Sequence, residues 1–347
     1  MADDRDKLLI YQMNIIFASK TRYSARYALL REYPSTHPEH GQTMSSKLMY
    51  EEIILRGCRT AYIDTDPDQK STKPIVICLH GLPSSSFMYR KVIDDLSFEA
   101  RVLAPDLPGF GNSQKITAWE LSFAEYEVWL DRLVTELVPA DAKVNLILHD
   151  ISGPFGLAWA ARHPERVQSV LILNTSIFIE HFRPPLPALM GMIPKIGHRL
   201  VEAGMHGRLL EEGLKRAFHC PMDEDTLQHY CAPYDEHETR EALANVFANY
   251  AHAFGYLKAL RETLKQSIFP CTILFGQKDR YCRPANATAF ANHIHGAYVR
   301  FLQGVGHFVA EEAPFVVADE MRRLLRQTSP SQVALDESSG NPVRMSA

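Results

Sequence analysis

One stretch near the middle of the chain, residues 144–156, limits the fold more than any other. It reads VNLILHDISGPFG, which is a continuous apolar run, one reactive side chain and then a run typical of a helix. A buried strand that turns sharply into a helix, with one reactive side chain at the turn, has the outline of a nucleophile elbow. The central position of this elbow falls on Asp150, and Ser152 takes the position two residues later, where a small side chain is required.

Two other interpretations of this stretch have to be weighed. If Ser152 were the reactive group, Pro154 would occupy the later small position, and a proline ring without an N–H fits poorly there. Asp150 could instead be an ordinary N-cap of the helix that follows. We interpret Asp150 as the reactive group, and these residues alone leave the N-cap interpretation open.

Composition narrows the class of protein. The chain has 347 residues, of which 46% are hydrophobic, and a net charge of −4, so one large domain with an insertion is expected and a nucleic-acid partner is not. No segment has the length and purity of a membrane span. The six cysteines are scattered without a C-x-x-C pair, which predicts free thiols and a cytoplasmic location.

Short apolar runs alternate with helix-like segments up to residue 174, and this pattern predicts an α/β fold with a mostly parallel sheet and helices on both faces. The strand pattern then disappears for about ninety residues and resumes at Cys271, which indicates a helical cap inserted between two strands. The predicted organisation is an N-terminal arm, 1–43; a core, 44–174 and 267–327; a helical cap, 175–266; and a disordered tail, 328–347.

Three groups fall at predicted strand ends in the order Asp150, Asp279, His307. Nucleophile, acid and base follow this order in one class of hydrolytic triad, and reactive groups in such sheets collect beyond the carboxyl ends of the strands. Alone, Asp279 could be a turn residue and His307 an ordinary loop histidine. The competing position for the acid, after strand 167–173, holds Asn174, which cannot supply a charge.

Residues 48–325 resemble the α/β-hydrolase superfamily and, within it, the haloalkane dehalogenase and epoxide hydrolase group. The resemblance implies an eight-stranded α/β-hydrolase fold with a helical cap. It rests on HGLPSSS at 80–86, APDLPGFGNS at 104–113, HDISGPFG at 149–156, RHPERV at 162–167, GQKD at 276–279 and GVGHF at 304–308.

Carried over to this chain, the resemblance implies that Asp150 attacks a carbon of the substrate and forms an ester. His307, oriented by Asp279, would then activate the water that hydrolyses this ester. The backbone N–H groups of Leu82 and Ile151 would form the oxyanion hole. The partner is a small molecule, no cofactor or metal is expected, and a homodimer is left open.

The chain departs from dehalogenases at two positions. Their halide-binding Trp after the nucleophile is Ile151 here, and the Asn at the HGxP position is Leu82. No Trp lies in the predicted cap, because the chain's three are Trp119, Trp129 and Trp159. Dehalogenation is therefore disfavoured, since a leaving halide would lack side-chain donors.

Epoxide opening instead needs an acid in the cap, and Tyr250 is our first candidate, with His181 second. For either residue taken alone, packing in the core or a place on the surface is the more common role. We therefore expect a hydrolase that acts on an epoxide. The alternatives are a halide, ester or lactone treated by the same residues, or a non-catalytic binding protein with the hydrolase fold.

Overall fold

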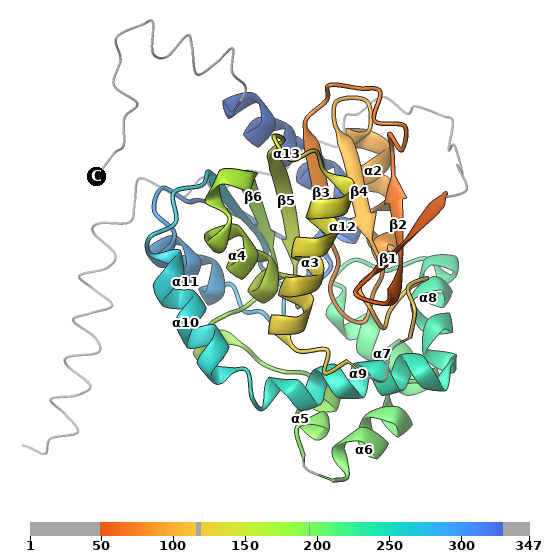
Figure 1. The fold of residues 1–347 in the computed structure, drawn as a ribbon. Helices are drawn as coiled ribbons and strands as arrows, with labels where there is room; N and C mark the ends of the chain where they lie inside the picture. The colour runs from red at the N-terminus through yellow and green to blue at the C-terminus, as the bar shows by residue number, and fades with distance from the viewer. Residues whose placement is uncertain (1–48, 116–118, 194, 329–347) are drawn as a thin grey trace, which may run out of the picture.

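The computed structural model describes residues 49–115, 119–193 and 195–328. The predictions made for the arm, 1–43, and for nearly all of the tail, 328–347, lie outside these residues. Eight strands form one sheet in the order β1-β2-β4-β3-β5-β6-β7-β8 (Figure 1). Their bounds are β1 Tyr50–Leu55, β2 Cys58–Asp64, β3 Ile75–Leu79, β4 Arg101–Pro105, β5 Val144–His149, β6 Val167–Leu173, β7 Cys271–Gly276 and β8 Tyr298–Leu302.

The sheet is mostly parallel. Strands β3 to β8 run in one direction, whereas β1 and β2 form an antiparallel pair that joins the sheet through β4. Every residue of β3, β4, β5 and β7 is buried, as expected for parallel strands covered on both faces. The predicted fold, an eight-stranded α/β-hydrolase sheet, is confirmed.

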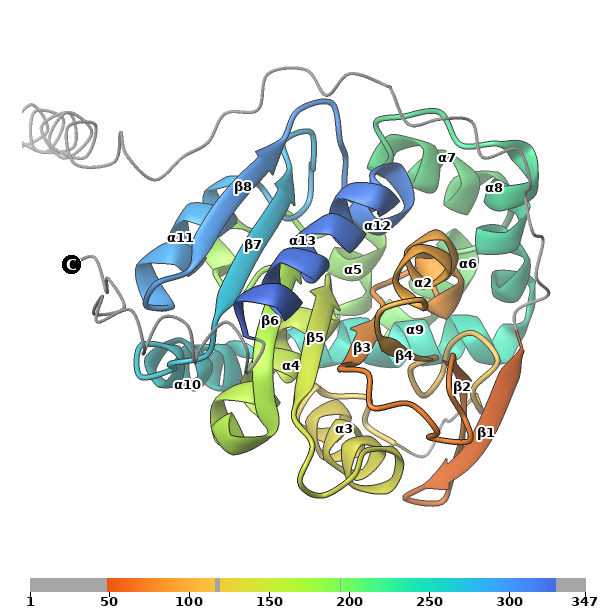
Figure 2. The same ribbon diagram turned by 90° about the horizontal axis from the view of Figure 1, so that it is seen from above.

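Helices cover both faces of this sheet (Figures 1 and 2). One layer contains α2 (Arg90–Leu96) and α13 (Pro314–Gln327), which pack on each other, and the other contains α3 (Phe123–Leu137), α4 (Ser152–Arg162) and α11 (Ala285–His293). In α3, Ser122 accepts a hydrogen bond from the N–H of Glu125 three residues on, an N-cap that fixes where the helix begins. None of the helices in the described ranges is long and apolar enough to cross a membrane.

The segment between β6 and β7 is helical, as its sequence pattern indicated. Its helices are α5 (Leu186–Gly191), α6 (Gly197–Gly204), α7 (Gly207–Ala217), α8 (Glu224–Cys231), α9 (His237–Tyr250) and α10 (Phe254–Leu264). Helices α5, α6 and α9 pack on one another, whereas α10 packs on α4 and α11 of the core. The predicted cap range, 175–266, thus includes one helix that lies along the core.

A buried carboxylate links the core to the cap. Glu311, in the short helix α12 (Val309–Glu312), lies at 5% side-chain exposure and accepts hydrogen bonds from both terminal nitrogens of Arg90. It also accepts bonds from Lys91 and from the hydroxyl of Tyr230 in α8. One carboxylate therefore neutralises core cations and holds a cap residue.

We expect Glu311→Ala to lower the free energy of unfolding by about 3 kcal/mol, because breaking a buried pair leaves the Arg90 charge without its partner. Lys91→Ala is the matched control, since the Lys91 side chain is 46% exposed and its loss should cost less than about 1 kcal/mol. Urea unfolding of both variants measures the difference. If both variants lose the same free energy of unfolding, Glu311 does not hold the cap to the core.

Candidate active site

Asp150 lies immediately beyond β5, in a backbone conformation that L-residues seldom adopt. Its φ is +50°, in the left-handed region, and its carbonyl oxygen accepts a hydrogen bond from the Thr175 hydroxyl at 2.5 Å. Gly81 permits the close approach of the neighbouring loop, because a Cβ there would lie 2.5 Å from the Asp150 Cβ. The geometry of this turn presents the Asp150 side chain at the carboxyl edge of the sheet.

The structure bears on two other interpretations of this turn, in which Asp150 is the N-cap of the next helix or Ser152 is the reactive group. Helix α4 begins at Ser152 with Ile151 as N-cap, and no side chain caps it. The Ser152 hydroxyl is fully buried, accepts a hydrogen bond from the His149 N–H, and lies 2.7–2.8 Å from the carbonyl oxygens of His149 and Leu79. Ser152 therefore stabilises the turn, and its hydroxyl is not free to react.

The two carboxylate oxygens of Asp150 have different surroundings. Oδ2 accepts a hydrogen bond from the Leu82 N–H at 2.9 Å, and the N–H of Ile151 also donates to this carboxylate. Oδ1 lies 3.9 Å from Nε2 of His307, beyond direct hydrogen-bond distance. The predicted oxyanion donors thus already contact the carboxylate.

His307 and Asp279 form a close pair. Nδ1 of His307 lies 2.8 Å from Oδ2 of Asp279, and both side chains are almost fully buried. The other oxygen of Asp279 accepts hydrogen bonds from the N–H groups of Tyr281 and Cys282 at 2.7 and 3.1 Å. The structure thus brings together the three residues that the sequence placed at separate strand ends.

Asn174 supports this pair, a role that the sequence did not reveal. Its amide nitrogen donates to Oδ2 of Asp279 at 2.7 Å, and its amide oxygen accepts a bond from the Gly276 N–H at 2.8 Å. The same nitrogen lies 3.2 Å from the carbonyl oxygen of Gly306, directly before His307. Asn174 therefore joins the loop of Asp279 to the loop of His307.

Burial and charge act in opposite directions on the base. Desolvation would lower the pKa of His307, but the charge and hydrogen bond of Asp279, helped by the charge of Asp150, raise the pKa to about 9. Burial raises the pKa of Asp150, and the His307 charge and the backbone donors oppose this effect. At neutral pH His307 is therefore an imidazolium that lies between the side chains of Asp279 and Asp150.

A second buried histidine positions the base. His149 lies one residue before Asp150, and its Nε2 is 2.8 Å from the carbonyl oxygen of His307. Because burial holds the pKa of His149 well below its ordinary value, the ring is neutral and Nε2–H is the donor. Its other nitrogen, Nδ1, is buried without a hydrogen-bond partner among the described residues.

Two cap phenols lie within electrostatic reach of Asp150. Burial first, and then the Asp150 charge, raise the pKa values of Tyr234 and Tyr250 far above the ordinary value, so both stay protonated. The Tyr234 hydroxyl is buried and has no hydrogen-bond partner within the described ranges, which leaves its proton available. No pattern in the sequence distinguished Tyr234 from the other cap tyrosines. His181 lies in η3 (Ile179–His181), where its ring packs against Phe178.

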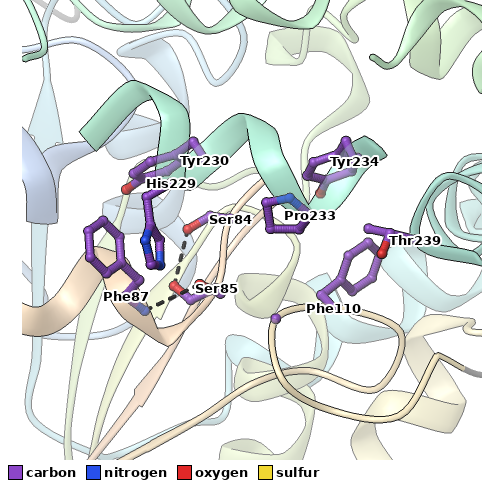
Figure 3. Close-up of a pocket in the computed structure, with 10 residues that line it drawn as sticks. Ser84, Ser85, Phe87, Phe110, His229, Tyr230, Pro233, Tyr234 and Thr239 are labelled. Carbon is purple, nitrogen blue, oxygen red and sulfur yellow. Dashed lines mark hydrogen bonds between the residues drawn. The ribbon is translucent and has the colours of Figure 1, made fainter. Parts of the chain in front are cut away.

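Tyr234 also lines a narrow pocket at the seam between cap and core (Figure 3). His229, Tyr230 and Pro233 lie on the cap side of this pocket, and the core side includes Ser84, Ser85, Phe87 and Phe110. The ring of Phe87 stacks on that of His229 with centroids 3.6 Å apart. The space left is about 10 Å³, enough for about one water molecule.

All three tryptophans are engaged outside the site. The indole N–H of Trp129 donates to Thr60, that of Trp159 donates to Asp131, and the Trp119 ring lies under the Arg56 guanidinium. None of these contacts involves Asp150, Asp279 or His307. These tryptophans therefore do not replace the halide-binding Trp that dehalogenases have at the position of Ile151.

The described residues contain one buried group that could hold a metal ion, formed by Asp279, Cys282 and His307 with donor atoms within 4.8 Å of one another. Two of these donors, Oδ2 of Asp279 and Nδ1 of His307, already bond to each other. A metal ion bound there would have to break that pair.

Comparisons with known proteins agree with this fold. Residues 74–194 match the family described as alpha/beta hydrolase fold. The chain is 27% identical over 266 residues to a haloalkane dehalogenase of Agrobacterium fabrum, covering 72% of this chain and 83% of that protein. It is 25% identical over 268 residues to a cis-3-alkyl-4-alkyloxetan-2-one decarboxylase of Shewanella oneidensis, covering 73% and 82%. The solved epoxide hydrolase CorEH has the same fold, with a TM-score of 0.67, 20% identity and coverage of 81% and 99%.

The chain therefore has the α/β-hydrolase fold. Its resemblance to the haloalkane dehalogenase and epoxide hydrolase group is confirmed.

The raised pKa of His307 predicts a specific pH dependence of stability. A pKa raised from 6.5 to about 9 on folding stabilises the protein fully below pH 6.5, and this stabilisation is lost as the pH rises through 9. The stability advantage of the wild type over His307→Gln should therefore be largest near pH 6 and shrink by pH 9.5. Urea unfolding of both proteins at the two pH values tests this; a constant difference would mean that His307 is not charged at neutral pH.

Proposed function

We propose that this protein hydrolyses a small, largely apolar electrophile through an ester formed on Asp150, and that the electrophile is an epoxide. The observation that supports this best is the asymmetric surroundings of the Asp150 carboxylate. Oδ2 contacts the Leu82 N–H, and Oδ1 lies 3.9 Å from Nε2 of His307. The buried Tyr234 hydroxyl, whose pKa the Asp150 charge raises, has no hydrogen-bond partner among the described residues.

In the first step, Oδ1 of Asp150 attacks a ring carbon of the epoxide. The ring C–O bond breaks, its electron pair goes to the ring oxygen, and this oxygen takes the proton of a cap phenol. The imidazolium of His307 then returns a proton to the phenolate. Forming the ester removes the Asp150 charge, one of the interactions that raise the pKa of His307, so this transfer becomes easier.

In the second step, neutral His307 takes a proton from water as the water oxygen attacks Cγ of the Asp150 ester. Oδ2, already hydrogen-bonded to the Leu82 N–H, becomes the oxyanion. The intermediate collapses, the diol oxygen leaves with the proton from His307, and the acid formed on Asp150 gives its proton back to His307. The net reaction is epoxide plus water to diol.

A lactone is the second candidate. The Shewanella relative named as an oxetanone decarboxylase aligns over 82% of its length, and an oxetan-2-one is a strained four-membered lactone. When Asp150 attacks the sp³ ring carbon that carries the ring oxygen, that C–O bond breaks and a carboxylate leaves, which needs no proton from a cap phenol. The two candidates therefore differ in their demand for Tyr234 and Tyr250.

We expect His307→Gln to stop after the first step, because a carboxylate attacks carbon without a base whereas its ester needs activated water. Incubation with a series of 1,2-epoxyalkanes should add the mass of one opened substrate to the intact protein, at Asp150. Bromoalkanes of equal length should label more slowly. The double variant Asp150→Asn/His307→Gln is the control, and an adduct that persists in it would refute Asp150 as the nucleophile.

Tyr234→Phe and Tyr250→Phe should each slow epoxide opening by roughly 10²-fold, the usual contribution of one general acid, and leave lactone opening nearly unchanged. Adduct formation in the His307→Gln background isolates this step. Tyr256→Phe is the matched control, because its hydroxyl bonds to Glu127. Equal rates in all three variants would indicate that no cap phenol takes part.

A further inference from the structure

The loop that carries His307, residues 304–308, lies against the cap as well as against the core. In this base loop the N–H of His307 donates a hydrogen bond at 2.9 Å to the carbonyl oxygen of Ala217, the last residue of α7. The residue after each of these two is a phenylalanine, and the rings of Phe218 and Phe308 stack with centroids 4.5 Å apart. Backbone and side chains therefore both hold the base loop to the end of α7.

One carboxylate bonds to both sides of this contact. Glu312 ends α12, which lies beside α7 (Figure 2). Its Oε1 accepts a hydrogen bond from the N–H of Gly306 in the base loop at 3.0 Å. Its Oε2 accepts bonds from the N–H groups of His219 and Cys220 in the cap at 2.8 and 3.0 Å. Hydrogen bonds to an ionised acceptor are stronger than neutral ones, so Glu312 is well suited to fasten the base loop to the cap.

The absence of a side chain at Gly306 makes this contact possible. A Cβ at that position would lie 2.6 Å from the carbonyl oxygen of Ala217, and 2.8 Å both from Oε1 of Glu312 and from the backbone nitrogen of His219. The backbone of the base loop thus approaches the cap as closely as a chain can. A shift of residues 217–220 would therefore be passed on to His307, the next residue after Gly306.

Glu312 also acts on His307 through its charge. Burial lowers the pKa of His307, whereas Asp279, Asp150 and Glu312 raise it. The rings of His149 and Tyr281 face the same imidazole, with centroids 4.9 and 5.5 Å away. Among the described residues, Glu312 is the one of these three acids whose carboxylate bonds to the cap.

We infer that Glu312 is a positioning residue for the base, which holds the base loop against the cap so that Nε2 of His307 faces Asp150. Glu312 acts through His307 and is itself engaged with three backbone N–H groups. Its effect on hydrolysis of the ester rests on the proposed function, whereas its effect on His307 in the free protein does not. The step that depends on it is the second one, in which His307 takes a proton from water.

The test compares two neighbouring glutamates. Glu312→Gln keeps the size of the side chain but loses its charge and one acceptor, and Glu312→Ala removes all three hydrogen bonds. Glu311→Gln is the matched control, because Glu311 also joins core and cap but bonds to Arg90 and Tyr230 instead of the base loop. A purely structural role would make the three variants alike.

The first measurement separates the two steps of the reaction. Both Glu312 variants should hydrolyse the Asp150 ester more slowly than the wild type, by about tenfold or more, because a misplaced base activates water poorly. Mass spectrometry of the intact protein during turnover of 1,2-epoxyhexane should then show more ester in these variants than in the wild type or Glu311→Gln. In the His307→Gln background, Glu312→Gln should leave the rate of labelling unchanged.

The second measurement needs no substrate. An NMR titration follows the imidazole of His307, identified by the signal that is missing from His307→Gln. Loss of the Glu312 charge should lower the pH midpoint of this signal by roughly 0.5, because a nearby negative charge favours the imidazolium. Glu311→Gln should leave the midpoint where it is in the wild type.

An unchanged midpoint in Glu312→Gln, or an equal change in Glu311→Gln, would overturn the inference. Equal ester levels in Glu312→Gln and the wild type, with an epoxide that labels His307→Gln, would overturn it as well. If the midpoint falls as expected and no epoxide labels His307→Gln, the positioning role stands and the proposed reaction fails.

Discussion

The structure of the site depends on one backbone constraint, the left-handed conformation of Asp150 at the end of β5. A residue in this region is strained, and the strain persists only because the surroundings hold it. Thr175 bonds to the Asp150 carbonyl oxygen, Ser152 bonds within the turn, and the absence of a Cβ at Gly81 allows the neighbouring loop to approach. The same approach brings the Leu82 N–H to the carboxylate, so the turn and the oxyanion donors form together.

A second constraint is electrostatic. Asp279 and Asp150 both raise the pKa of His307, and the proposed ester on Asp150 would remove one of these two interactions. The network around Asp279 stays unchanged in that event, because Asn174 and two backbone N–H groups hold it independently of Asp150. The proposed reaction therefore changes the proton affinity of His307 without requiring the residues that orient it to move.

Sequence reasoning was most successful where the backbone determines the site. Asp150, Asp279 and His307 each follow a buried parallel strand, and parallel strands end at one edge of the sheet, so their meeting could be predicted from position alone. Tyr234 could not be predicted, because which tyrosine of a helical cap faces the core depends on how the helices pack. The role of Asn174 could not be predicted, because it consists of hydrogen bonds between loops that are far apart in the sequence. The sequence shows only that Asn174 carries no charge. Helix α10 was assigned to the cap because its sequence resembles that of its neighbours, whereas its packing on α4 is a tertiary property.

The hydrogen-bond donors around Asp150 decide which leaving group suits this site. The side chains of Leu82 and Ile151 cannot donate, and the indoles of Trp129 and Trp159 bond to Thr60 and Asp131. Among the described residues, a halide leaving from carbon would find the backbone donors that already serve the Asp150 carboxylate and the cap phenols. A protonated phenol can donate a hydrogen bond to a halide, whereas an oxygen that becomes basic as its ring opens can take the phenol proton itself. Tyr234 keeps its proton in an apolar setting without another acceptor among the described residues, and that arrangement favours a strained ring oxygen as the leaving group.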